Sequence, residues 1–299
     1  MKKSKFKFSA TSIVVALFML LLIVYCISLI VPFVWGLFSS VKGNIEFDLN
    51  LLGLPEGKIW EWKWSNYKLV FENFYVIHYK DGLEYKTTMV GLIINSVLYA
   101  FGGAFCSTFV SCLVGYLIQR FPCKFSKLLH TIVIVTMITP IVGNQTSMLQ
   151  ILMGLKIYDT MLGAYLLALN FTSLYTLVFI ASFKGVAMDF SEAAYLDGAG
   201  PITVFFRICL PLVKSTFGTI FLLLFIARWN DYSTPLLYLP NQPTLAYGLL
   251  YFDRSPETLL NFPNIKIAGC MFLLIPILLI FLIFHNKIME GVSMGGVKE

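Results

Sequence analysis

The chain has 299 residues, of which 58% are hydrophobic and only 13% are charged, whereas soluble domains carry charges on about a quarter of their residues. This composition excludes an ordinary soluble domain and indicates a membrane protein with several spans, whose backbone polar groups must be satisfied within helices. The basic residues behind the net charge of +6 flank apolar runs, so they indicate orientation in the membrane and not affinity for nucleic acid.

The N-terminal stretch Met1–Phe8 contains four lysines and no acid, and an uncharged run continues from Phe8 to Val41. Because this run is far longer than the apolar part of a signal peptide, we expect a retained first span at about 10–38, with the lysines in the cytoplasm. The polar segment 42–86 follows, with six lysines, seven acids and several aromatic residues. We expect it to lie outside and to fold on the membrane surface with its aromatics as interfacial anchors, an aromatic ligand platform being the alternative.

Three further spans are expected at 88–118, 128–153 and 161–183, because each is an apolar run with few charges. A short basic loop from Arg120 to Lys127 separates the first two of these and is expected in the cytoplasm. Polar side chains at membrane depth should face protein or water, which makes them candidates for lining a pore. In the expected spans 128–153 and 161–183 these candidates are Asn144, Gln145, Asn170 and Tyr175.

The fifth span is unusual because its uncharged part, Ser215–Ala227, is too short to cross a bilayer, which takes about 20 residues. The apolar pattern resumes beyond Asp231, so the span is expected at 213–238. Arg228 and Asp231 then lie three residues apart on one helical face, either lining a cavity or forming an interfacial pair. Asn230 and Asp231 join the pore candidates. A sixth span is expected at 267–285, followed by a cytoplasmic tail, 286–299.

The expected fold class is therefore all-α, a single membrane domain with six spans and both termini in the cytoplasm. In this arrangement the cytoplasmic segments hold twelve Lys/Arg and five Asp/Glu, and the external ones hold ten and eleven, which gives +7 inside and −1 outside. This asymmetry agrees with the preference of basic residues for the cytoplasmic side.

Signatures of an enzyme or of a metal site are missing from the sequence. The three histidines are scattered, the six cysteines form no CxxC pair, and no HExxH, GxSxG or P-loop pattern occurs. We therefore expect no catalytic residue, no metal and no cofactor bound by this chain. A secondary transporter is a weaker alternative, because Asp231 is the one candidate acid at membrane depth and Pro140 has no clear counterpart in the other half.

The polar stretch Asp189–Leu212, DFSEAAYLDGAGPITVFFRICLPL, lies between two apolar runs and has the order of two short helices. Asp189 is expected to cap the first helix, with Glu192 reaching back in a capping box. Gly198 suits the left-handed position after that helix, and Pro201 can open the second. Leu210-Pro211 is expected to end the second helix.

This stretch resembles the EAA loop of ATP-binding-cassette (ABC) importer permeases, in which EAA is followed by a Gly and then by Ile-x-Leu-Pro. The matching residues are Glu192, Ala193, Ala194, Asp197, Gly198, Leu210 and Pro211. In that family the loop is a cytoplasmic coupling helix that docks into a cleft of the ATPase subunit. The resemblance implies that the loop, 184–212 here, transmits ATPase motion to the spans.

Other motifs resemble the maltose-permease-like, carbohydrate branch of that family and cover most of the chain. They are Asn66-Tyr67, Asn95-Ser96-Val97, Tyr116 with Arg120-Phe121, and Trp229-Asn230-Asp231. The tail Gly291, Gly295, Gly296, Val297 and Lys298 resembles the family ending that reaches into the ATPase dimer interface, although Glu299 replaces the usual final Gly.

The resemblance implies a type I ABC importer permease in the plasma membrane of a bacterium. Its partners would be a second, different permease subunit, two ATPase subunits that hydrolyse ATP, and an external solute-binding protein. This chain would form half of the pore for a sugar or oligosaccharide. An ABC permease for a non-sugar solute is the alternative.

Overall fold

The structure is a computed structural model, and it describes residues 10–80, 82–139, 143–254 and 260–293. The described residues form two compact units, each considered by itself. One combines the chain up to Glu72 with the segment that ends at Phe272, and the other combines Asn73–Arg254 with the chain from Leu273 onward.

The first unit is built around the C-terminal half of α1 (Ala10–Ser40). It also contains α2 (Asn44–Leu49), the 3₁₀ turn η1 (Ile59–Glu61), most of α3 (Ser65–Asn73) and the start of α15 (Pro263–Ser293). Gly36 lies close to Met271, and Asn66 donates to the carbonyls of Ser40 and Lys42 at 2.9 and 2.8 Å. Asn66, in the Asn-Tyr motif, therefore fastens α3 to the end of α1.

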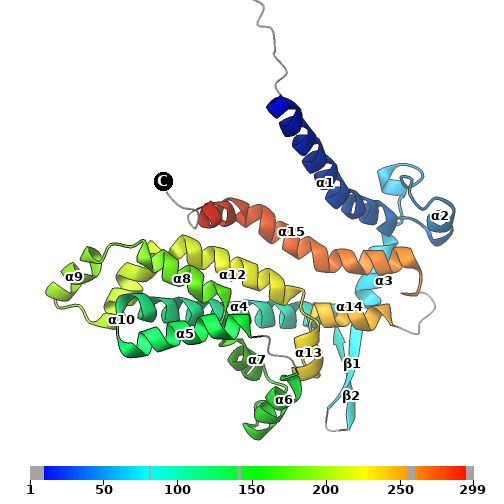
Figure 1. Ribbon diagram of the computed structural model, residues 1–299. Coiled ribbons are helices and arrows are strands. Elements are labelled where there is room, and N and C mark those ends of the chain that lie inside the picture. The colour runs from blue at the N-terminus through cyan, green and yellow to red at the C-terminus, as the bar shows by residue number, and fades with distance from the viewer. Residues whose placement is uncertain (1–9, 81, 140–142, 255–259, 294–299) are drawn as a thin grey trace, which may run out of the picture. The chain divides into compact units, whose positions relative to one another are not determined.

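The second unit is organised around α4 (Met89–Arg120), the longest described helix (Figure 1). Helix α4 contacts α5 (Lys124–Ile138), α7 (Met161–Ala168), α8 (Leu174–Lys184), α12 (Lys214–Trp229) and α14 (Leu245–Asp253). The remaining helices are α6 (Gln145–Gly154), α9 (Asp189–Leu196), α10 (Pro201–Val204), the π-helical turn η2 (Phe205–Cys209), α11 (Leu210–Leu212) and α13 (Ser233–Tyr238).

The expectation of an all-α chain needs one correction, because residues 75–88 form an antiparallel hairpin. Strand β1 (Tyr75–Lys80) pairs with β2 (Leu83–Thr88), with His78 opposite Tyr85. The residues that separate the strands are Asp81-Gly82, and Gly82 has φ +77°. Asp-Gly between two β-prone runs is a strong hairpin signal.

Three of the six predicted spans, 10–38, 88–118 and 267–285, correspond to the continuous helices α1, α4 and α15. The other three are interrupted. Three helices are long and apolar enough to cross a membrane, or up to five if each sharply bent helix pair is one span. The predicted span 128–153 is divided between α5 and α6, 161–183 between α7 and α8, and 213–238 between α12 and α13. Because apolar residues lie on both sides of each interruption, the hydropathy pattern alone does not reveal these breaks.

Candidate coupling segment and polar interruptions

The residues Asp189–Leu212, here called the coupling segment, form the predicted helix, glycine turn and helix. Gly198 has φ +84°, and the Ala199 N–H donates to the Ala194 carbonyl at 2.9 Å while the Gly198 N–H donates to the Tyr195 carbonyl at 3.0 Å. This pair of bonds is a complete Schellman motif, which closes the C-terminal end of α9. Pro201 then opens α10 at its first position, as expected.

The predicted capping box at the start of α9 is wrong. Met188 is the N-cap residue with helical backbone angles, no side chain caps the helix, and the Met188 carbonyl accepts from the N–H of Ser191 at 2.8 Å. Asp189 is therefore already inside the first turn. The entry to α9 is held instead by Arg120 of α4, which donates to the Val186 carbonyl at 3.0 Å and contacts the Met188 sulfur.

One face of the coupling segment is buried in an aromatic core shared with the long helices. This core includes Ala194 of α9, Phe205 and Cys209 of η2, Tyr116 of α4 and Phe183 of α8. The Tyr116 ring lies 4.9 Å from the Phe205 ring and 5.5 Å from that of Phe183, measured between centroids. Any displacement of the coupling segment therefore has to move the aromatic side chains of α4 and α8.

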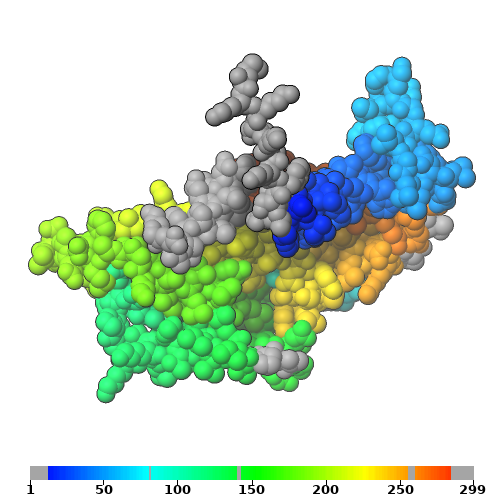
Figure 2. All heavy atoms as spheres, turned by 45° about the horizontal axis from the view of Figure 1, so that its top comes forward, coloured from blue at the N-terminus to red at the C-terminus, as the bar shows by residue number. Residues whose placement is uncertain are grey.

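The opposite face of the coupling segment is open and apolar at its centre. Leu196 is 89% exposed and Ile202 is 75% exposed. Of the residues predicted to couple, Glu192, Ala193, Asp197, Gly198 and Pro211 are also exposed, Leu210 is half-buried, and Ala194 alone is buried. Figure 2 shows atoms of this part of the chain, in yellow-green, uncovered at one end of the second unit.

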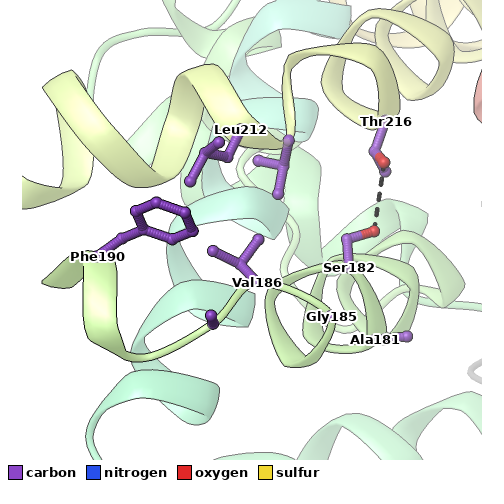
Figure 3. Close-up of a pocket in the computed structure, with 9 residues that line it drawn as sticks. Ala181, Ser182, Gly185, Val186, Phe190, Leu212 and Thr216 are labelled. Atoms are coloured by element: carbon purple, nitrogen blue, oxygen red, sulfur yellow. Dashed lines mark hydrogen bonds between the residues drawn. The ribbon is translucent and has the colours of Figure 1, made fainter.

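A pocket of about 400 Å³ lies where the coupling segment joins the spans. Helices α8 and α9 are bent by 72°, and the helical stretch Pro201–Leu212 is bent by 78° from α12. In Figure 3 the side chains of Phe190, Leu212 and Val186 approach one another on one side of the pocket, and Ser182 and Thr216 are hydrogen-bonded at 3.3 Å on the other. Residues from both bends therefore line one shared pocket.

Most of the pore candidates lie at the interruptions of the predicted spans. Asn144 and Gln145 stand at the start of α6, and the Gln145 carbonyl accepts from the Tyr238 hydroxyl at 3.1 Å. Asn170 lies between α7 and α8, where its side chain accepts from the Thr172 N–H. Asn230 ends α12 and donates to the Ile226 carbonyl. Tyr175 differs, because it packs against the aromatic core of the coupling segment.

The expectation that Arg228 and Asp231 share one helical face is wrong, because α12 ends at Trp229. The Asp231 carboxylate accepts from the Tyr99 hydroxyl at 2.7 Å and from the N–H groups of Ser233 and Thr234, so it caps α13. Among the residues that the structure describes, the one ion pair is Lys68–Glu72.

Arg228 turns toward α4 instead. Its guanidinium donates to the Ser107 hydroxyl at 3.1 Å, and Ser107 donates to the carbonyl of Ala168, the last residue of α7, at 2.7 Å. A Cβ on Gly103 would lie 2.8 Å from the Arg228 side chain, so this glycine makes the space that the arginine occupies. A cation near the C-terminal end of α7 is also favoured by the helix dipole.

Sequence reasoning missed three of the α4 residues that hold the interruptions, namely Tyr99, Ser107 and Ser111. The hydroxyl of Ser111 lies 3.3 Å from that of Ser173, which precedes α8. These residues are spaced by eight and then by four positions, which places them on one helical face that could have been noticed as a polar stripe in an apolar run.

The remaining predicted site is the C-terminal tail. Gly291 lies in the last turn of α15. Gly295, Gly296, Val297 and Lys298 lie outside the described residues. Their predicted docking into an ATPase stays a prediction.

Comparison with known proteins decides the family. Residues 107–291 match the family described as "Binding-protein-dependent transport system inner membrane component". The chain belongs to this family. It is a family of transport components and not of enzymes, and the matched region contains the whole coupling segment and both bends.

Individual sugar-transport permeases are similar to this chain over stretches longer than the family match. The arabinooligosaccharides transport system permease protein AraQ of Bacillus subtilis is 28% identical over 212 residues, which is 68% of this chain and 72% of AraQ. The diacetylchitobiose uptake system permease protein NgcG of Streptomyces coelicolor is 23% identical over 278 residues, 92% of this chain and 86% of NgcG.

A solved structure shares the fold. The crystal structure of a bacterial ABC transporter involved in the import of the acidic polysaccharide alginate contains a chain that superposes with a TM-score of 0.74 and 16% identity. The superposition covers 95% of this chain and 99% of the other. The ABC importer permease fold is thus established for this chain.

Proposed function

We propose that this chain is a plasma-membrane permease subunit of a bacterial ABC importer and forms half of a pore for a sugar or oligosaccharide. The relatives named for arabinooligosaccharides and diacetylchitobiose support a carbohydrate cargo. ATP is hydrolysed by two separate ATPase subunits, a second and different permease chain completes the pore, and an external binding protein delivers the sugar. Six spans, with α5–α6, α7–α8 and α12–α13 as interrupted ones, place both termini in the cytoplasm.

The observation that carries this proposal is the two-faced coupling segment. Its buried face joins the aromatic core around Tyr116, and its open face presents Leu196 and Ile202. A rigid, capped helix with an apolar tip suits a cleft on an ATPase, because a push on the tip reaches α4 and α8 directly. The Schellman turn at Gly198 keeps the two short helices from bending independently.

The proposed pore lining consists of Asn144, Gln145, Asn170, Asn230 and Asp231, with Tyr175 nearer the coupling segment. Non-helical backbone at membrane depth is tolerated where it is buried in protein or lines a water-filled cavity. Asn170 and Asn230 are exposed at such interruptions. Amides at these positions offer donors and acceptors that match the hydroxyl groups of a sugar.

The test of the assembly is affinity purification of the tagged chain from its native membrane in mild detergent, followed by mass spectrometry. We expect an ATPase, a second permease and a solute-binding protein, and the binding protein would then be screened with oligosaccharides. Recovery of the chain alone, or with itself only, would contradict the proposal. Recovery of a binding protein that takes amino acids or peptides would keep the importer and replace the cargo.

A further inference from the structure

An uncharged loop of the first unit presents leucines to its surroundings. The residues Leu49–Leu54, here called the leucine loop, begin at the last residue of α2. Leu49 is 84% exposed, Leu52 is 82% exposed and Leu54 is 65% exposed. Figure 2 shows this part of the chain, in blue to cyan, projecting from the end of α1. Exposure of several leucines in one short loop marks an interaction surface rather than ordinary surface variation.

The leucine loop is rigidly attached to the end of α1. The ammonium of Lys42, which is fully buried, donates to the carbonyls of Asn50 and Gly53, each at 2.6 Å. The indole of Trp35, within α1, donates to the Leu51 carbonyl at 2.8 Å. The loop therefore has a fixed position relative to the helix that precedes it.

Most backbone carbonyls of the leucine loop accept hydrogen bonds from other groups of the protein. The Asn50 side chain accepts from the Gly53 N–H at 2.8 Å and donates to the Leu54 carbonyl at 3.1 Å. Together with the bonds from Lys42 and Trp35, this occupies the carbonyls of Asn50, Leu51, Gly53 and Leu54. Such satisfaction is what a hydrocarbon environment demands, because lipid tails offer no hydrogen bonds.

We propose that the leucine loop inserts into the lipid leaflet at the end of α1 and anchors the first unit to the bilayer surface. The occupant of this surface is lipid and not a protein, because the loop is held at the end of α1, a long apolar helix whose residues from Ile13 to Val31 are exposed. Ile45, on α2, and Trp60 are further apolar residues of the first unit with high exposure, at 76% and 74%. Tryptophan is favoured at the membrane interface.

The test uses a nitroxide label on Leu52→Cys, an exposed position where the substitution spares the core. Native cysteines are replaced, and the transporter is purified with its accompanying subunits and reconstituted in vesicles of phosphatidylethanolamine and phosphatidylglycerol. Collision of the label with oxygen, which concentrates in lipid, is compared with collision with a water-soluble nickel chelate. Lys68→Cys is the matched control in the same unit, because the Lys68 side chain is 78% exposed and charged.

We expect oxygen to dominate at position 52 by several-fold and the nickel chelate to dominate at position 68. A label at 52 that prefers the nickel chelate, including one that becomes protected only when the solute-binding protein is added, would overturn the proposal. A label at 52 that neither reagent reaches would assign the loop to a protein interface and overturn it as well. A Lys42→Met variant should increase the mobility of the label, because it removes the attachment of the loop.

Discussion

At the level of single residues, Gly198 forms the turn between the two short helices of the coupling segment. Its φ of +84° lies in the left-handed region, and no atom lies within 4 Å of the place where a Cβ would be. A side chain would therefore fit in space and would be opposed only by the backbone, at about 1–2 kcal/mol for an ordinary L-residue. This separation of backbone strain from steric clash makes the position suitable for a clean test.

Gly198→Val is expected to assemble with its partners and to uncouple transport from ATP hydrolysis, because a β-branched residue resists the left-handed turn between the two helices. Sugar uptake per ATP hydrolysed in proteoliposomes measures the effect, and we expect a loss of at least tenfold. Gly200→Val is the matched control, because Gly200 has φ −77° and equally open space. Equal, undiminished transport by both variants would sink the coupling role of the turn.

A second residue-scale test concerns Cys123, which is exposed at the start of α5. Hydrogen bonds from the backbone N–H and the side chain of Ser126 hold the pKa of the Cys123 thiol below its usual range. A lowered pKa increases the thiolate fraction near neutral pH, so Cys123 should be alkylated faster than glutathione below pH 8 and should lose this advantage as the pH rises further.

The same reaction reports orientation. A membrane-impermeant maleimide should label Cys123 in inside-out vesicles and leave it unlabelled in right-side-out cells, with Cys123→Ser identifying the signal. Labelling from the outside alone would show that the proposed topology is inverted.

At the level of elements, α4 is the helix to which the neighbouring shorter helices are hydrogen-bonded. Tyr99 binds the carboxylate that caps α13, Ser107 binds the end of α7, and Arg120 binds the entry to α9. Residues of the family-like motifs act in the same way, since the Ser96 hydroxyl accepts from the Leu245 N–H at 2.6 Å. Most of these motif residues use their side chains to bind backbone groups of other segments, so their role in this structure is to hold elements together.

Gly103 and Arg228 should show strong coupling in a double-mutant cycle. Gly103→Ala alone places a Cβ 2.8 Å from the Arg228 side chain and is expected to destabilise the protein by about 1–3 kcal/mol, as overpacking does. In an Arg228→Ala background the same change should be nearly silent. Thermal inactivation of the purified transporter measures both effects, and additive effects would contradict the packing of Arg228 on α4.

Sequence reasoning anticipated the continuous helices and the glycine turn, because a long apolar run or a Gly-then-Pro order acts locally. It predicted α7 and α8 as one span and α12 and α13 as another. The break after α7 is held by Ser107 and Ser111 of α4, which bind Ala168 and Ser173 and lie far away in the sequence. The break after α12 is held by Tyr99 of α4, which binds Asp231. It also gave α9 a local cap, whereas Arg120 supplies the contact from another helix. Contacts between residues far apart in the sequence do not change the local hydropathy pattern, so this pattern could not predict where these helices end.

At the level of the whole molecule, we propose that the coupling segment receives the motion of an ATPase and passes it to the interrupted helix pairs of the second unit. The coupling segment is bent by 72° and 78° from its neighbours around a partly empty pocket, and its core is continuous with α4 and α8. The family to which the chain belongs depends on a binding protein. An importer of this kind requires a site where the ATPase can push, and we propose that the open face with Leu196 is this site.

Site-specific photo-crosslinking tests this central claim most directly. A benzophenone amino acid is introduced at Leu196 or, as the control, at Tyr79 in the hairpin, which is 68% exposed, and whole membranes are irradiated. The account predicts that position 196 crosslinks to an ATPase subunit and that position 79 does not. Absence of an ATPase adduct at 196, or an ATPase adduct at 79, would contradict it.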